Sequence, residues 1–420
     1  TYVGSCEKTE ALAWVYDKET NKLVQRQMTF VPGLYKIFDE ILVNATDNKV
    51  RDPTMVTLRV DIDPEAGCVR VYNDGNGIPV EMHKEEGVYV PELIFGHLLT
   101  SSNYDDNEKK VTGGRNGYGA KLANIFSKEF VIETCDGSRE RRYRQVFRNN
   151  MTEKCAPVVT KCKPTDNWTC ITFKPDLEKF NMTCLEEDTV ALMCKRVYDA
   201  AGNIGQNTKI FLNGERLKVK GFSDYVDLYL DGRENAPKIY QKVNDRWEVC
   251  VTISDSGNFQ QCSFVNGICT MKGGTHVNAV ADDVASKLLE KIKKKEKSCK
   301  NLKTTHVKNH LWVFVNALIE NPAFDSQTKE TLNTRAANFG SKFEAPDSII
   351  KKMMNSGVVE QILSWASFKQ SKEMKKQDGA NGVHAIWTFG GEGQDRETPQ
   401  REEQEKNRIS PNCCLTSSAS

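Results

Sequence analysis

The 420-residue sequence lacks the patterns that assign a chain to several common classes. It contains no apolar run of about 18 residues, so we expect no membrane-spanning helix and no membrane partner. Its 14 cysteines would suit a disulfide protein by number, but they are scattered and include no Cys-x-x-Cys pair, which favours reduced, mostly structural thiols. The formal net charge is only +1, so any contact with nucleic acid must come from a local basic cluster.

The common phosphate-binding motifs are also missing. The glycine-rich segment 112–121 is not a P-loop, because Ala120 separates Gly119 from Lys121 and Leu122 occupies the Ser/Thr position. It also lacks the third glycine of a dinucleotide fingerprint. Even so, four glycines and a lysine within ten residues form a loop whose backbone amides can surround phosphate oxygens. Taken alone, this segment is a weak indication of a phosphate site.

Two earlier segments strengthen that indication. Apolar residues recur with helical spacing from Leu34 to Ala45, and Glu40, Asn44 and Asp47 share one narrow stripe beside them. This stripe suits metal and water handling, although from this helix alone a solvated helix face is the better explanation. The second segment, residues 73–79, follows a predicted strand pair over residues 55–73 and has the composition of a turn.

The order of the three segments resembles the GHKL ATPase superfamily, which includes gyrase, Hsp90 and histidine kinases. Within it, the match narrows to eukaryotic DNA topoisomerase II, through the segments 38–45, 99–106, 113–121 and 327–329. The resemblance extends from residue 1 to about residue 368. It implies an α/β fold, an α+β two-layer sandwich that binds ATP without a P-loop.

The resemblance also implies a division into domains. Residues 1–215 would form the GHKL ATP-binding domain, and residues 216–370 a transducer with a ribosomal-S5-like fold. Residues 371–420 are rich in Gln, Glu, Lys, Gly and Ser, which predicts a low-complexity, disordered tail. The hydrophobic pattern predicts helices at about 32–49, 187–201, 277–291 and 346–365, strands at 169–173, 247–253 and 261–265, and a strand with a turn over 209–214.

The family assigns roles to matching positions in this sequence. Glu40 would be the general base, Asn44 would bind Mg²⁺, and Asn73 would read the adenine edge, where most of the superfamily has Asp. Asp74 is therefore not the adenine-reading residue. The ribose and phosphate side would be lined by Ser101, Ser102 and Asn103. The phosphates would be held by Gly114, Arg115, Asn116, Gly117, Tyr118, Gly119, Ala120 and Lys121. The second domain would supply Gln327, Thr328 and Lys329, with Lys329 pairing with the γ-phosphate.

One strong basic cluster occurs, at residues 291–300. A lysine run is usually the solvated end of an amphipathic helix. The family instead places a DNA-facing lysine loop here, which makes Lys293, Lys294 and Lys295 candidate contacts to double-stranded DNA.

The function implied is the ATP-hydrolysing gate of a type II DNA topoisomerase, a homodimer in the nucleus that couples ATP turnover to DNA strand capture and passage. The family's N-terminal strap and its DNA-cleavage domain are expected to be missing from this sequence. An alternative is therefore a truncated paralogue that acts as a non-cutting, ATP-dependent DNA clamp. An Hsp90-like chaperone is disfavoured by the 327–329 segment.

Overall fold

The computed structural model describes residues 3–97, 111, 118–230, 232–233, 236–254, 256–296, 301–365 and 367–368. Residues 1–366 form one compact unit; of the second unit, residues 367–420, only Ser367 and Phe368 are described. The expected tail at residues 371–420 therefore lies outside the described residues. Among the helices that are described, none has the length and apolar character needed to span a bilayer.

A large sheet carries the first half of the described chain. Its strand order is β11-β10-β3-β4-β9-β5-β6-β7, with β8 also paired to β6, and only β10 and β3 run parallel. The strands are β3 (Thr57–Asp63), β4 (Cys68–Asp74), β5 (Ser127–Asp136), β6 (Arg141–Arg148), β7 (Glu153–Lys154), β8 (Val158–Lys161), β9 (Trp168–Pro175), β10 (Lys209–Leu212) and β11 (Glu215–Arg216). Alternate residues such as Leu58, Val60, Val69 and Val71 are buried, as expected for a sheet covered on one face.

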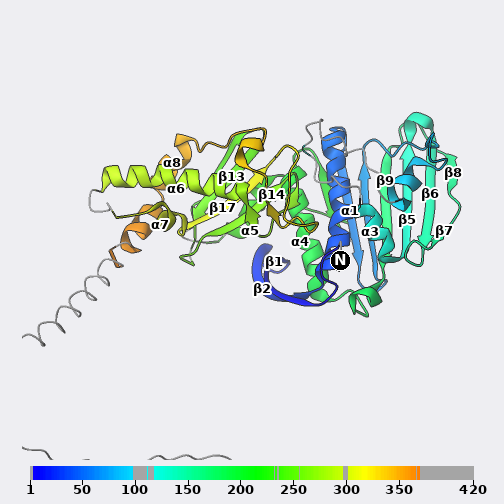
Figure 1. Cartoon of the computed structure of the whole chain (residues 1–420), viewed down its shortest axis with the longest axis horizontal. Coiled ribbons are helices and arrows are strands. Elements are labelled where there is room, and N and C mark those ends of the chain that lie inside the picture. The colour runs from blue at the N-terminus through cyan, green and yellow to red at the C-terminus, as the bar shows by residue number, and fades with distance from the viewer. Residues whose placement is uncertain are drawn as a thin grey trace, which may run out of the picture. The chain divides into compact units, whose positions relative to one another are not determined.

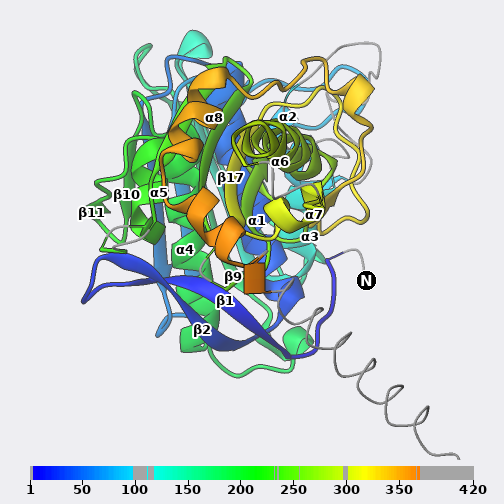
Figure 2. The same ribbon diagram turned by 90° about the vertical axis from the view of Figure 1, so that its left-hand side faces the viewer.

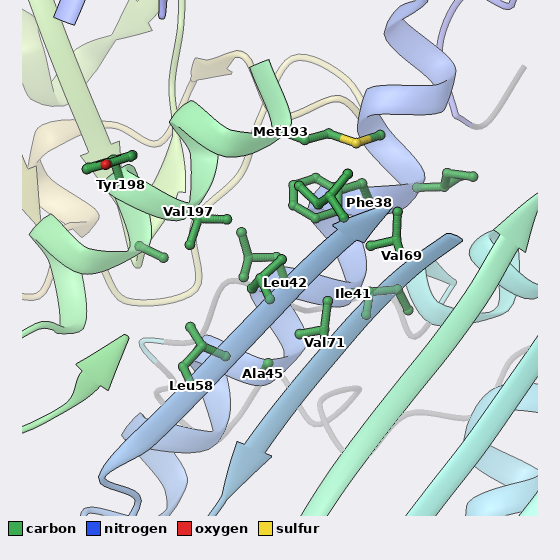
Figure 3. Close-up of a cluster of buried hydrophobic side chains, with 14 of the residues drawn as sticks. Phe38, Ile41, Leu42, Ala45, Leu58, Val69, Val71, Met193, Val197 and Tyr198 are labelled. Atoms are coloured by element: carbon green, nitrogen blue, oxygen red, sulfur yellow. The ribbon is translucent and has the colours of Figure 1, made fainter. Parts of the chain in front are cut away.

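Helices pack against the buried side of this sheet (Figure 1). They are α1 (Pro32–Arg51), α2 (Val90–Gly96), α3 (Gly119–Ile125) and α4 (Glu187–Ile204). Pro32 lies in the first turn of α1, where its missing N–H costs nothing. Figure 3 shows the apolar stripe of α1, including Phe38, Ile41 and Leu42, against β3, β4 and α4. This packing fixes α1 and, with it, the polar stripe beside the apolar one.

A small sheet forms the second half, in the order β12-β13-β17-β14-β15. Its strands are β12 (Ile239–Asn244), β13 (Trp247–Ile253), β14 (Gln260–Val265), β15 (Ile268–Cys269) and β17 (Leu311–Ala317). Leu311, Val313 and Val315 belong to the core under α6 (Thr275–Lys295), whereas Trp312 and Phe314 belong to the core shared with α4 and α5 (Phe222–Leu230). Because β17 is buried on both faces, it is a nearly continuous apolar run.

The remaining elements connect and cover these sheets. Figure 2 shows the hairpin of β1 (Thr9–Asp17) and β2 (Lys22–Phe30) running beside α4, and α6 seen end-on. The short strands β16 (Gly273–Gly274) and β18 (Thr331–Leu332) pair in parallel just before α6. The helices α7 (Thr304–Lys308) and α8 (Asp347–Met354) complete the second core.

The structure confirms the predicted α/β class and most predicted elements, with two corrections. The strand pair expected over residues 55–73 begins later than predicted: β3 starts at Thr57, and Val56, which precedes it, is 46% exposed. The helix expected over residues 346–365 is interrupted: α8 ends at Met354, and helical residues resume at Val358. Asn355 caps α8, and Gly357 has a positive φ of 29°, which a continuous helix does not allow.

Candidate functional site

Helix α1 presents the predicted polar stripe at the edge of the core. Glu40 and Asp47 are buried, and Asn44 between them is half-buried. Among the described residues, the carboxamide of Asn44 has no hydrogen-bond partner. The stripe is therefore not a fully solvated face, because two of its three members are shielded from water.

Glu40 is held by two lysines. Its Oε1 lies 2.9 Å from Lys36 Nζ, on the same helix, and 3.4 Å from Lys329 Nζ. Burial alone would raise the pKa of Glu40, but Lys329 and Lys36 together lower it below the ordinary value. The carboxylate therefore stays ionised, which is the state a general base requires.

Lys329 comes from a loop next to the small sheet. Its backbone has a φ of 60°, a left-handed conformation that non-glycine residues rarely adopt. The loop is fastened on both sides, because Lys329 N donates to Ser326 O and β18 pairs with β16. A buried lysine in a strained, anchored turn reaches another part of the molecule, which is the pattern expected of a functional contact. Gln327 and Thr328 precede it and are half-buried.

The end of β4 carries the segment predicted to read adenine. Asn73 is buried and donates to the carbonyl of Asp74. The Asp74 side chain accepts from the N–H groups of Val56 and Thr57, at 2.8 Å each, so it has a structural role. A Cβ on Gly77 would collide with the backbone carbonyl of Cys135 in β5. Glycine is needed there because the segment lies directly against the neighbouring strand.

Part of the predicted phosphate loop is described. Gly119 begins α3 directly beside α1, and a Cβ on it would run into Glu40 Oε2. Ala120 is buried, Tyr118 is half-buried, and burial lowers the pKa of Lys121 to about 8. The other predicted contacts, Ser101, Ser102, Asn103, Gly114, Arg115, Asn116 and Gly117, lie outside the described residues.

The predicted DNA contacts lie elsewhere. Lys293, Lys294 and Lys295 occupy the last turn of α6, at the end that Figure 1 shows pointing away from α1. Lys294 pairs with Glu290 at 2.6 Å, on an exposed face. The three lysines are thus separate from the Glu40 site and accessible to solvent.

Sequence reasoning missed three charged residues at the site. Lys36 contacts both Asp39 and Glu40, and Arg196 of α4 contacts Asp39 at 2.7 Å. Burial opposes ionisation of Asp39, but Arg196 and Lys36 hold the pKa of its carboxyl well below the usual range. The position of Lys36, four residues before Glu40, was a signal in the sequence, since i,i+4 side chains are neighbours on a helix. Arg196 had no local signal.

Two family models match the chain in succession. Residues 31–179 match the model described as "Histidine kinase-, DNA gyrase B-, and HSP90-like ATPase", and residues 221–381 match the one described as "DNA gyrase B". The 43K ATPase domain of Thermus thermophilus gyrase B, at 21% identity and a TM-score of 0.56, shares the fold. These findings define a GHKL-type ATPase domain followed by a gyrase B-type domain.

Relatives of higher sequence identity show which family of these ATPases the chain belongs to. The chain is 50% identical to the ATPase region of Saccharomyces cerevisiae topoisomerase II, with a TM-score of 0.82 over 87% of this chain and 94% of that one. The ATPase and transducer domains of DNA topoisomerase II from Balamuthia mandrillaris give 47% and 0.84, over 88% and 94%. DNA topoisomerase 2 of Pisum sativum is 62% identical over 90% of this chain and 26% of its own length. The chain belongs to the eukaryotic DNA topoisomerase II family, and it spans about a quarter of the length of these curated relatives.

Proposed function

We propose that this chain binds and hydrolyses ATP and acts as the ATP-operated gate of a type II DNA topoisomerase. The observation that carries the proposal is the contact between Lys329 and Glu40. It joins the loop beside the small sheet to the helix that covers the large sheet. If Lys329 exchanges Glu40 for the γ-phosphate of ATP, the contact between the two halves depends on the nucleotide.

Glu40 is proposed as the general base that takes a proton from the attacking water. Both lysines lie at Oε1, whereas Oε2 faces Gly119 at the start of α3. Oε2 is therefore the oxygen turned toward the segment that would hold the phosphates. Departure of Lys329 to the γ-phosphate would also make Glu40 more basic at the moment when a base is needed, since one of its two cationic partners would be gone.

Asn44 is proposed as the protein ligand of Mg²⁺. Its carboxamide oxygen is a hard donor of the kind Mg²⁺ prefers, and it projects from α1 one turn after Glu40. Within the described residues no group of three or more His, Cys, Asp or Glu side chains could hold a metal ion. A single amide ligand fits Mg²⁺ bound mainly through water and phosphate oxygens. The ion would neutralise phosphate charge during transfer.

The remaining contacts follow the family pattern. Asn73 would read the adenine edge, and Lys121 with the amides of residues 114–119 would hold the β- and γ-phosphates. Burial depresses the pKa of Lys121, so a phosphate beside it would favour the charged form that the site needs. Ser101, Ser102 and Asn103 would line the ribose side. Gln327 and Thr328 would support Lys329 at the γ-phosphate.

The activity of the whole protein is part of the proposal. We propose double-stranded DNA as its substrate, with Lys293, Lys294 and Lys295 as contacts, and an ATP-dependent homodimer in the nucleus. The large and small sheets would correspond to an ATP-binding domain over residues 1–215 and a transducer over residues 216–370. The relatives carry the name DNA topoisomerase 2, and the DNA-passing reaction is proposed for this protein on that likeness.

The proposal is tested on the chain itself. Steady-state release of phosphate from ATP should require Mg²⁺, and calorimetry should detect binding of both ADP and a non-hydrolysable ATP analogue. Cross-linking with and without the analogue reports whether nucleotide promotes dimers. If the folded chain binds neither nucleotide, the ATP-site assignment is wrong.

A further inference from the structure

A buried series of ion pairs leads from Glu40 into the fold. Lys36 Nζ lies 2.9 Å from Glu40 Oε1 and 3.1 Å from Asp39 Oδ2. Asp39 Oδ1 accepts a 2.7 Å hydrogen bond from Arg196 Nε. All four residues are at most 5% exposed. Lys36 is therefore shared between two carboxylates, and its place depends on both.

The series ends at the small sheet. Arg196 Nη2 donates to the carbonyl of Gly267 at 2.8 Å. Gly267 lies in the tight turn between β14 and β15, where both Asn266 and Gly267 have positive φ. Since Lys329 also comes from that half of the molecule, the small-sheet side contacts Glu40 directly at one end and through Arg196 at the other.

Such an arrangement is a poor way to gain stability. Burying charges costs solvation energy, and well-packed apolar residues of the same volume are often equally stabilising. Among the described residues, Arg196 Nη1 is also buried without a hydrogen-bond partner. These ion pairs are better explained by the position in which they hold Glu40 than by a contribution to the stability of the fold.

We propose that Lys36 and Arg196 are positioning residues for Glu40, with Lys36 fixing the carboxylate and Arg196 making that position depend on the docked β14–β15 turn. The proposal rests on the proposed function, because it assigns how the base is held. Lys36 remains at Oε1 when Lys329 turns to the γ-phosphate, so Oε2 keeps its direction toward α3. Arg196 holds Asp39 and the Gly267 carbonyl through two donors of one rigid planar group, a geometry that the flexible ammonium of a lysine does not reproduce.

The first experiment compares Lys36→Met with Lys36→Arg in the full chain. Lys36→Met should lower kcat for ATP roughly ten- to hundredfold through misplacement of the base, with KM changed less than about threefold. Lys36→Arg, which keeps the charge, should recover most of kcat. Arg196→Lys also keeps the positive charge but loses the planar group, so it should still lower kcat. If Lys36→Met does not fold, Lys36→Gln carries the same expectation.

The matched control is Lys195→Met. Lys195 is the neighbour of Arg196 on α4, is largely buried and pairs with Asp199 at 2.9 Å, outside the series. It should lower the melting temperature while leaving kcat unchanged. If Lys195→Met lowers kcat as much as Lys36→Met, or if Lys36→Met keeps the parental kcat, the positioning role is overturned and the series is only structural.

A double variant separates this proposal from the proposed function. If Lys36 acts through Glu40, then Glu40→Gln with Lys36→Met should turn over ATP at the residual rate of Glu40→Gln alone. A further loss in the double variant would show that Lys36 acts on something else. Should Glu40→Gln itself hydrolyse ATP at the parental rate, the base assignment fails, and the positioning role fails with it.

Discussion

Helices α1 and α6 have nearly the same length, 20 and 21 residues, but they treat charge in opposite ways. The buried side of α1 includes Lys36, Asp39, Glu40 and Asp47. The buried side of α6 is apolar except for His276, and Lys293, Lys294 and Lys295 are exposed in its last turn. Both helices pack through an apolar stripe, so the difference lies in what each carries beside it.

The contrast between α1 and α6 separates functional charge from ordinary surface charge. A buried charge requires partners at fixed distances, and each charge of the Glu40 group has them. Among the last-turn lysines of α6, Lys294 has an exposed pair with Glu290, and such pairs are worth about 0–1 kcal/mol. Substitutions in α1 should therefore change chemistry or folding, whereas those at the end of α6 should change only long-range attraction.

The largest effect is expected for Glu40→Gln. Loss of the general base should lower ATP hydrolysis about 10²–10⁴-fold while ATP still binds. The control on the other helix is Glu290→Gln, because Glu290 is exposed and its ion pair with Lys294 is exposed as well. A phosphate-release assay on both variants is decisive: parental turnover by Glu40→Gln would contradict the assignment of the base.

Asp39→Asn should destabilise the fold. Removing one partner of a buried ion pair costs about 3–5 kcal/mol at pH 7, and here Arg196 would lose its carboxylate. The control, Asp282→Asn on α6, removes an exposed pair with Lys308 and should change stability by about 1 kcal/mol or less. Urea unfolding of both variants measures the contrast, and equal losses would contradict it.

The same carboxylate predicts a pH dependence. The folded-state pKa of Asp39 lies below its ordinary 3.8, so its contribution is complete above that pH and is lost as the pH falls below it. The stability gap between the parent and Asp39→Asn should therefore be constant from about pH 7 to 5 and shrink below about pH 4. A gap that is unchanged in acid would mean that Asp39 is not ionised in the fold.

Lys329→Ala should lower ATP turnover but leave ADP affinity nearly unchanged, because its proposed partner exists only in the triphosphate. A charge-assisted hydrogen bond is worth about 1.5–3 kcal/mol, or roughly ten- to hundredfold in affinity. The control is Lys272→Ala, an exposed lysine that pairs with Glu330 in the same loop. Calorimetry with ADP and an ATP analogue makes the comparison, and equal losses for both nucleotides would remove the γ-phosphate role.

The smallest effect is expected at the end of α6. Neutralising Lys293, Lys294 and Lys295 should leave basal ATP turnover intact and weaken DNA binding. Each lost phosphate contact should reduce the slope of log K against log[salt] by about 0.9. A control with the same change in net charge neutralises the exposed Lys18, Lys84 and Lys161. If the two triple variants have the same salt slope, the cluster is an ordinary solvated helix end.

Local sequence patterns predicted much of the fold, and they failed where a tertiary contact or the backbone conformation sets the end of an element. The start of α1 at Pro32 and strand β13 follow from turn chemistry and hydrophobic spacing. Val56 continues the alternation of β3, yet it is exposed because the first ladder pair of β3 and β4 joins Leu58 to Asn73. The break between α8 and the following helical residues depended on the backbone at Gly357, which spacing of apolar residues does not report.

The residues of the site also divide into those that local patterns predicted and those that depend on a distant contact. The spacing of Glu40 and Asn44 on one helix face is a property of the sequence, and the structure keeps it. Lys329, 289 residues from Glu40, was expected there only through the resemblance to the topoisomerase II family. Arg196 was not anticipated at all, because it meets Asp39 across 157 residues and no local period relates them.

Hydrophobic period, turn residues and short motifs act over a few positions, so the amino-acid sequence predicts most of the elements and the family that the chain resembles. Which charges are buried, and therefore what they do, follows from the packed fold alone. Lys36 and Lys293 are both helix lysines in the sequence, but the fold places one between two carboxylates and leaves the other in the exposed last turn of α6. The physical reason is that the energy of a charge depends on its solvent exposure and on the distance to its partners, and both are set by packing between distant segments.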